Sequence, residues 1–108
     1  MRPIQTLWLG FLTVTGCGCS TSSDTFRVDD AHGLVTSATI VVCGAETAMK
    51  RQGDHFAASH QITCEGSGRV RLSYQDGGTR ECIVGYVTNL HQDWNFRASP
   101  AGCESKRS

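Results

Sequence analysis

Residues 69–88 read Arg-Val-Arg-Leu-Ser-Tyr-Gln-Asp-Gly-Gly-Thr-Arg-Glu-Cys-Ile-Val-Gly-Tyr-Val-Thr, and this stretch decides the fold class. Its first part alternates polar and apolar residues, which is the two-residue period of a half-buried strand. Asp76, Gly77 and Gly78 follow, and these residue types tolerate the positive φ that a tight chain reversal requires. The rest is rich in β-branched residues and returns as a second strand. The stretch therefore predicts a β-hairpin with one buried face.

The pattern leaves the register of this hairpin open. A loop of three residues would place Val70, Leu72 and Tyr74 opposite Val84, Cys82 and Tyr86. A two-residue Gly-Gly loop would pair Leu72 with Ile83 instead. We expect the large aromatic residues to lie in the core, and these are Tyr74, Tyr86, Trp94 and Phe96.

Shorter signals on both sides of the hairpin have the same character. The segments predicted as strands are 36–43, 48–51, 55–58, 61–64 and 94–97, with turns at 53–54 and 66–68. A short helix over 46–51 is the one local alternative, and no amphipathic helix of ten or more residues is predicted. The sequence thus predicts an all-β domain, a small disulfide-stabilised antiparallel sandwich of about six or seven strands.

Length and composition agree with one small domain. The chain has 108 residues, and its 10 Lys and Arg balance its 10 Asp and Glu. A neutral chain has no broad basic surface for nucleic acid, so we expect no nucleic-acid partner.

The amino terminus has the layout of an export signal. Arg2 supplies a cation, residues 4–14 are mostly apolar, and small residues follow. This apolar segment is shorter than the roughly 20 residues that span a bilayer. Residues 1–16 are therefore predicted to be a signal peptide.

The sequence Val14-Thr15-Gly16-Cys17 resembles the lipobox of bacterial lipoproteins. The resemblance implies cleavage before Cys17, acylation of Cys17, and a membrane partner reached through the acyl chains. Gly18 follows the cysteine, and in this class a residue other than aspartate favours the outer membrane. We expect residues 17–33 to be the acylated cysteine and a flexible tether, and 34–108 to be the β-rich domain. Cleavage that releases a soluble secreted protein is the alternative.

Six cysteines in an exported chain of this size predict disulfides. Cys43, Cys64, Cys82 and Cys103 lie in the domain, and the equal spacings favour the pairs 43–64 and 82–103 among three possible connectivities. Cys17 and Cys19 are the one cysteine pair as close together as zinc ligands usually are, but they lie at the predicted processing site. Disulfides are favoured in an exported chain, so no metal site is predicted. Cys19 has no assigned partner.

No motif for catalysis or for a cofactor is present, and we expect neither. Asp29 and Asp30 are expected to be solvated. Arg69, Arg71 and Arg80 are candidate partner-binding residues if they share a polar face of the hairpin, although solubility alone explains such a face. The sequence therefore predicts a small cell-envelope lipoprotein whose β-domain binds or modulates an unknown envelope protein or glycan. A soluble secreted inhibitor or effector-like protein is the alternative.

Overall fold

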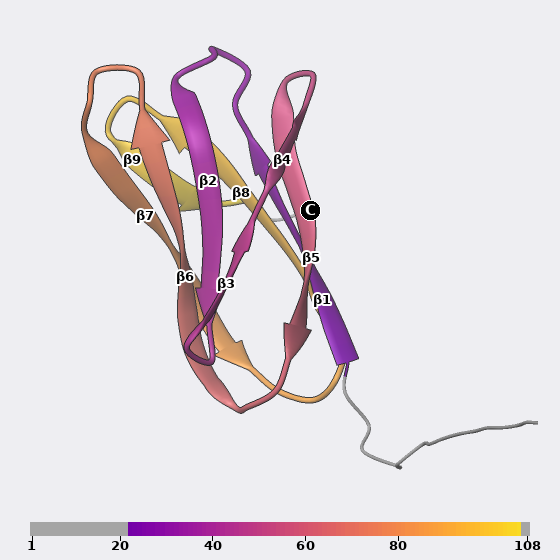
Figure 1. Ribbon diagram of the computed structural model, residues 1–108. Coiled ribbons are helices and arrows are strands. Elements are labelled where there is room, and N and C mark those ends of the chain that lie inside the picture. Colours follow the sequence, from indigo (N-terminus) through magenta and orange to yellow (C-terminus); the bar gives the residue numbers. More distant parts are fainter. Residues whose placement is uncertain (1–21, 107–108) are drawn as a thin grey trace, which may run out of the picture.

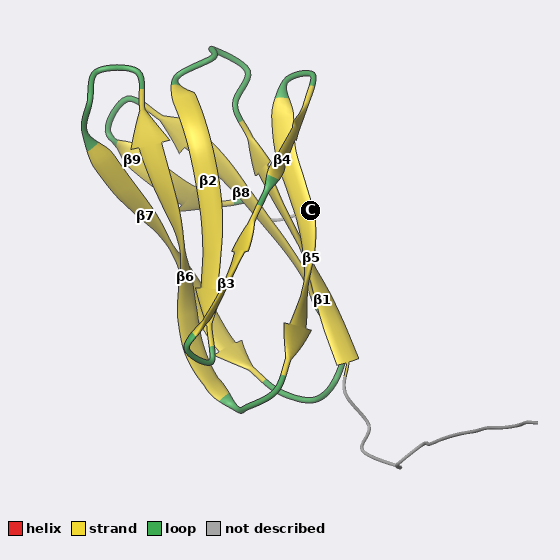
Figure 2. Cartoon of the chain, in the orientation of Figure 1, coloured by secondary structure: helices red, strands yellow, loops and turns green. Residues whose placement is uncertain are grey.

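The computed structural model describes residues 22–106, and within them nine strands form two packed sheets (Figures 1 and 2). The strands are β1 (Ser22–Asp29), β2 (Val35–Val42), β3 (Ala45–Ala48), β4 (Lys50–Gln52), β5 (His55–Ile62), β6 (Gly66–Tyr74), β7 (Thr79–Val87), β8 (Asp93–Ser99) and β9 (Gly102–Ser105). The described residues contain no helix long and apolar enough to cross a membrane.

The two sheets form the predicted all-β sandwich. One sheet has five strands in the order β4-β5-β1-β8-β9, and the other has four in the order β3-β2-β6-β7. All neighbours are antiparallel except β1 and β8, which are parallel. The inner faces meet in one core, whose largest fully buried side chains include Phe26, Phe96, Ile40 and Leu72.

The first strand corrects the predicted domain boundary. Residues 22–29 were assigned to the tether, but they form β1, which lies between β5 and β8 in the five-stranded sheet. Phe26 and Val28 are buried on its inner face. Apolar residues that recur every second position indicate a strand, but here the first inward position is Asp24, which hid the pattern. The segment between Cys17 and the domain is therefore only four residues long.

The central hairpin has the predicted buried face in a different register. Tyr74 donates its amide hydrogen to Gly78 O, so residues 75–77 form the loop, and Gly77 has a φ of 86°. Leu72 consequently pairs with Arg80, and Val70 with Cys82. Both predicted pairings are wrong. The buried face is predicted correctly, because the observed partner of Leu72 differs by two positions from the Cys82 expected for a three-residue loop. A shift of two residues keeps every side chain on the same side of the sheet.

The predicted turn at 66–68 is part of β6 instead. Here glycine permits a close approach of two strands, because a Cβ on Gly68 would lie 2.5 Å from Val42 Cγ2 and 2.7 Å from Val41 O. The irregular register between Gly66 and Gly68 also rotates the end of β7. As a result Val87 is buried, whereas Tyr86 is 61% exposed, so its assignment to the core is wrong.

Residues 45–52 switch between the two sheets. β3 pairs with β2 in the four-stranded sheet, and β4 pairs with β5 in the five-stranded sheet. The helix proposed for 46–51 is therefore absent from this segment. Gly53 and Asp54 form the predicted turn, and β5 joins the two short strands expected at 55–58 and 61–64.

Two disulfides join the sheets. Cys43, after β2, is bonded to Cys64, after β5, and Cys82 of β7 is bonded to Cys103 of β9. These are the pairs that the equal spacing favoured. Each bridge connects one sheet to the other, so both help to hold the sandwich closed.

Candidate binding face

A groove of about 710 Å³ lies on the outward face of the five-stranded sheet. Its floor and rim carry side chains from β1, β5 and β8, and the switching segment β3–β4 forms one wall. The lining residues are Thr25, Phe26, Arg27, Thr47, Ala48, Lys50, Gln52, Ala57, Ala58, Ser59, Asp93 and Asn95. Small side chains on β5 leave room for the groove, and hydroxyl, amide and charged groups surround them.

Strand register brings two cations to the middle of this groove. Lys50 pairs with Ala57, and Ala57 pairs with Arg27, so the three residues form one row across β4, β5 and β1. Neighbouring strands are about 4.8 Å apart, which separates the two cationic side chains by about 10 Å at their bases. The methyl group of Ala57 leaves the space between them open. This row is suited to an anionic group above Ala57.

The charges around the row leave it net positive. Arg27 Nε donates to Asp29 Oδ1 at 2.7 Å, and Lys106 Nζ donates to Asp29 Oδ2 at 2.5 Å. These hydrogen bonds, first from Lys106 and then from Arg27, hold the pKa of Asp29 below its ordinary value of 3.8. The single carboxylate of Asp29 thus pairs with two cations, Arg27 and Lys106. Lys50 makes no ion pair with any residue of the described chain.

A second polar group, formed by His91 and Asp93, lies at the start of β8, where Asp93 lines the groove. His91 Nε2 lies 2.9 Å from Asp93 Oδ1, and the N–H at His91 Nδ1 donates a hydrogen bond to Ser23 O at 2.6 Å. The bonds to Ser23 and Asp93 raise the pKa of His91 above 6.5. Thr25, which donates to Asp93, and His91 lower the pKa of the Asp93 carboxyl. Thr25 and His91 thus hold the Asp93 carboxylate in place, and the lining of the groove has two cations, Arg27 and Lys50, against this one carboxylate.

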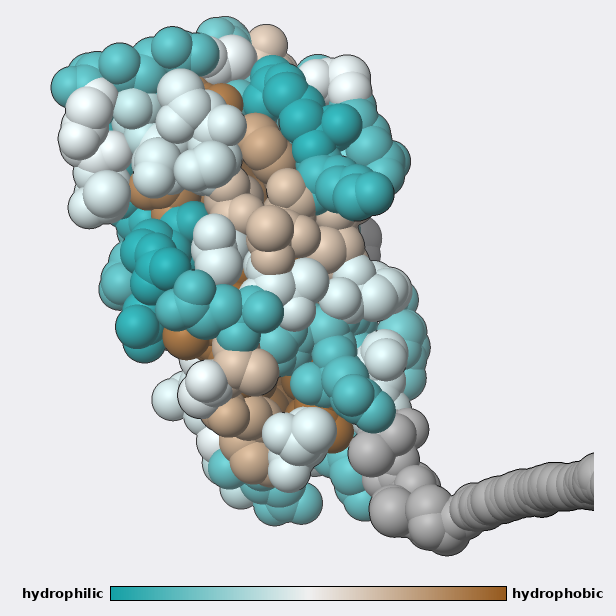
Figure 3. All heavy atoms as spheres, in the orientation of Figure 1, coloured by the Kyte–Doolittle hydropathy of each residue, from teal (hydrophilic) through white to brown (hydrophobic). Residues whose placement is uncertain are grey.

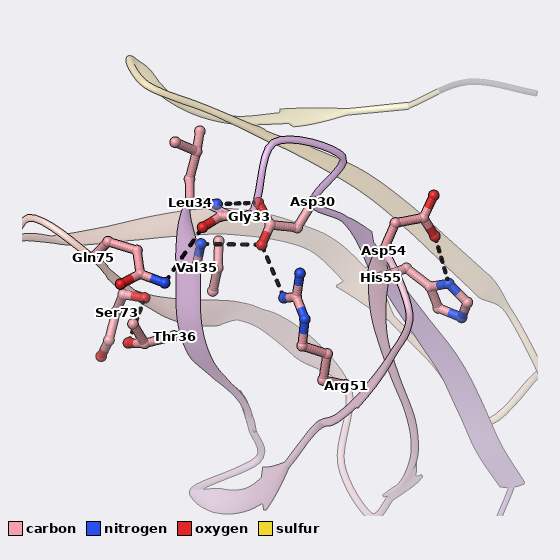
Figure 4. A network of polar contacts seen from close by, with 10 residues as sticks. All are labelled: Asp30, Gly33, Leu34, Val35, Thr36, Arg51, Asp54, His55, Ser73 and Gln75. Carbon is pink, nitrogen blue, oxygen red and sulfur yellow. Dashed lines mark hydrogen bonds and ion pairs between the residues drawn. The ribbon is translucent and has the colours of Figure 1, made fainter.

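The buried carboxylates serve the fold instead of a ligand. Asp30 is 1% exposed and accepts hydrogen bonds from the amides of Leu34 and Val35 and from Arg51 Nη1 (Figure 4). The expectation that Asp30 is solvated is wrong, because these donors replace water. Asp24 accepts in the same way from Gln92 N and Trp94 Nε1.

The buried histidine is satisfied as well. His60 Nδ1 lies 2.7 Å from Thr47 Oγ1, and its Nε2 lies 3.3 Å from Val42 O. The ring also packs edge-on against Phe26. In the part of the chain that the structure describes, no group of three or more His, Cys, Asp or Glu residues is placed to hold a metal ion.

The three arginines singled out in the sequence do not form one site. Arg69 and Arg71 lie on the outward face of β6, where they pair with Glu81 at 3.0 Å and Glu46 at 3.4 Å. Arg80 lies on the opposite face, with its guanidinium 4.2 Å from the centre of the Tyr74 ring. Its strand parity matches that of Cys82, so the hairpin cannot present all three together. Cys17 lies outside the described residues.

Sequence reasoning did not find the groove. Its cations lie on β1, predicted as tether, and on β4, which is only three residues long. The alternation Thr25-Phe26-Arg27-Val28-Asp29 was the available signal for β1. No local pattern indicates that Lys50 and Arg27 flank the same residue of β5, since that depends on strand order.

Comparison with known proteins places the fold in a class of all-β sandwiches. No family model matches the chain, and no curated protein matches it in sequence. A protein from Eubacterium rectale, solved by NMR, has a similar structure, with a TM-score of 0.56, 12% identity, and coverage of 87% of this chain and 96% of that one.

A second similar structure is that of the tip fimbrial protein Mfa3 from Porphyromonas gingivalis, in a C-terminally truncated form. The TM-score is 0.53 at 9% identity, over 80% of this chain. The chain spans 50% of the length of that protein. These similarities show a shared β-fold. The two disulfides indicate an extracytoplasmic location, because such bonds persist in oxidising compartments.

Proposed function

We propose that this protein is a bacterial cell-envelope lipoprotein whose β-domain is a non-catalytic binding module. In this proposal Cys17 carries the acyl chains, the outer membrane is the favoured location, and the groove on the five-stranded sheet contacts an envelope protein or glycan. The observation that carries the binding role is the row of Lys50 and Arg27 on either side of Ala57. An open groove with unbalanced charge is typical of a surface that recognises a partner of opposite charge.

The remaining polar groups support a binding role over catalysis. The buried groups Asp24, Asp30 and His60 each have structural partners. An active site needs a nucleophile or base that is free to reach a substrate, and these side chains are committed elsewhere. The groove itself carries cations, amides and hydroxyls that can orient a ligand.

The binding role is tested by recovering the full chain from the envelope. We would cross-link cells that produce a C-terminally tagged protein and identify the captured partners. Lys50→Glu should reduce the captured amount at least tenfold, whereas Arg71→Glu, on the other sheet, should not. Equal capture by both variants would contradict the proposed binding face.

The anchor is tested separately. Cys17→Ser should abolish labelling by radioactive palmitate and release the protein from membranes, because the acylated residue is lost. The intact mass of the mature amino terminus gives the same information for the unaltered chain. A mature protein that starts at residue 17 or later without acyl groups would establish the soluble secreted alternative.

A further inference from the structure

Two exposed large apolar side chains, Tyr86 and Leu90, lie at one end of the sandwich, and a third, Ile83, lies in the middle of β7. Ile83, Tyr86 and Leu90 are 70%, 61% and 71% exposed, and they are the exposed large hydrophobic residues of the described chain. Tyr86 is near the end of β7, and Leu90 is in the loop between β7 and β8. Exposed apolar side chains that gather in one region mark an interaction surface.

Hydrogen bonds place Leu90 beside the start of β1. The next residue, His91, donates to Ser23 O at 2.6 Å, and Thr25 N donates to Gln92 O at 3.1 Å. Because Ser23 is the second residue of β1, the loop that carries Leu90 lies at the end where the chain enters the domain (Figure 1).

Tyr86 lies at the same end. Its hydroxyl donates to Glu65 Oε1 at 3.1 Å, and Glu65 belongs to the turn that follows β5. The last residue of β5, Ile62, pairs with Ser22, the first residue of β1. Apolar side chains also show among the hydrophilic ones at this lower end of the molecule in Figure 3.

The distance between this end and the predicted anchor is short. Four residues separate Cys17 from Ser22, because β1 begins eleven positions before the predicted end of the tether at residue 33. Five fully extended steps reach about 18 Å at most. An acylated Cys17 would therefore hold the start of β1 within about 18 Å of the bilayer surface.

We propose that this end of the domain, through Leu90 and Tyr86, docks on the lipid bilayer to which Cys17 is anchored. The inference rests on the proposed acylation, and it adds an orientation and a second membrane contact. Leucine inserts its side chain below the headgroups, and tyrosine is an amphipathic residue favoured at the level of the headgroups. The charged neighbours are Glu65 and the His91–Asp93 pair, so the contact does not depend on anionic lipid.

Docking in this orientation has a functional consequence. The groove lies on the outward face of the five-stranded sheet, along the strands that rise from the docked end. The groove therefore faces sideways from the domain, parallel to the membrane plane. A partner that lies on or in the same membrane is then presented to Lys50 and Arg27.

The test uses the full acylated chain in vesicles of phosphatidylcholine and phosphatidylethanolamine. Trp94 is the single tryptophan of the mature chain, since Trp8 lies in the predicted signal peptide. A Leu90→Trp variant adds a reporter at the proposed contact. Ala101→Trp is the matched control, because residue 101 is exposed in the turn after β8, at the opposite end. Quenching by lipids brominated near the headgroups should be about threefold greater for Leu90→Trp.

The outcomes separate the two hypotheses. Intact mass first establishes whether Cys17 is acylated in the sample, so a missing anchor counts against the proposed function. If the protein is acylated and both variants are quenched equally, the docking proposal is wrong. Enhanced quenching only with phosphatidylglycerol present would also overturn it, because electrostatic attraction would then be the cause. Hydrogen exchange is the second measurement. On vesicles, Leu90→Ser should raise the amide exchange rate of residues 86–91 above that of the unaltered acylated chain. In the unanchored Cys17→Ser chain, studied in solution without detergent, the same substitution should leave that rate unchanged.

Discussion

The two outward faces of the sandwich both carry basic residues, but they differ in how fully acidic side chains pair with these cations. On the four-stranded sheet, Arg69 and Arg71 each pair with a glutamate from another strand of the same sheet. On the five-stranded sheet, Lys50 has no such partner among residues 22–106, and Arg27 shares Asp29 with Lys106. Charge count alone does not distinguish these faces. Strand register does, because it decides which side chains stand next to each other.

This difference explains why the sequence pointed to the wrong basic residues. Arginines that alternate along one strong strand are conspicuous, but cross-strand partners neutralise them. One cation of the groove, Arg27, is on β1, far from the β6 arginines in the sequence, and the other, Lys50, is on a strand of only three residues. Only the sheet brings these two cations together. A surface is available for a partner when its charges lack internal partners, not when it is rich in charge.

The largest effect is expected from removal of the Cys82–Cys103 disulfide, which joins β9, at the edge of the five-stranded sheet, to β7 of the other sheet. Replacing Cys82 and Cys103 by alanine should lower the free energy of unfolding by about 3 kcal/mol, because the loop of the unfolded chain is no longer constrained. β9 has only four residues and should exchange its amides fastest, whereas β6 should stay protected. Chemical denaturation and hydrogen exchange measure the two results. Uniform loss of protection would show that the two sheets do not differ in local stability.

The next effect concerns the groove. Charge reversal of Arg27 together with Lys50 should weaken partner binding at least tenfold, or about 1.4 kcal/mol, because both attractive charges become repulsive. Titration of the captured partner by calorimetry measures this change. The control is Arg69→Glu with Arg71→Glu, which should leave affinity within about twofold. An equal loss in the control would remove the distinction between the faces.

A smaller effect is expected from the ion pairs of the four-stranded sheet. Arg71→Ala should change the free energy of unfolding by less than about 1 kcal/mol, because both partners are well exposed and the pair is screened by solvent. Exposed fractions of 39% for Arg71 and 58% for Glu46 support this expectation. Thermal unfolding at low and high salt measures it. A loss several times greater would mean that this face contributes to stability as the core does.

The smallest effect is the acid response of Asp29. Its folded-state pKa is lowered by Lys106 and Arg27, so the ionised form contributes stability above the unfolded-state value of about 3.8. That contribution is lost as the pH falls below this value through the lowered folded-state pKa. Asp29→Asn should therefore be less stable than the unaltered chain at pH 7, and the difference should shrink as the pH falls below 3.8. A difference that is constant with pH would contradict the assignment to the carboxylate charge.

The sequence alone determined the fold class and the disulfide framework. Alternation in residues 69–74, β-branched runs and glycine turns are local properties, and they are enough to identify strands and their buried faces. The equal cysteine spacing favoured the pairs 43–64 and 82–103 that the structure contains. The signal peptide, Cys17 and Cys19 are predictions that lie outside the described residues.

Tertiary structure alone decided the hairpin register, the start of the domain and the location of the groove. Residues 22–29 have a weak local pattern because Asp24 occupies an inward position, and it is accommodated only by Gln92 and Trp94, about seventy residues away. Tyr86 was drawn out of the core by an irregular register between β6 and β7, which no single strand reveals. The groove needs β4, β5, β1 and β8 side by side. Local sequence sets the side-chain alternation within a strand, but the order of strands sets which alternating rows become one surface.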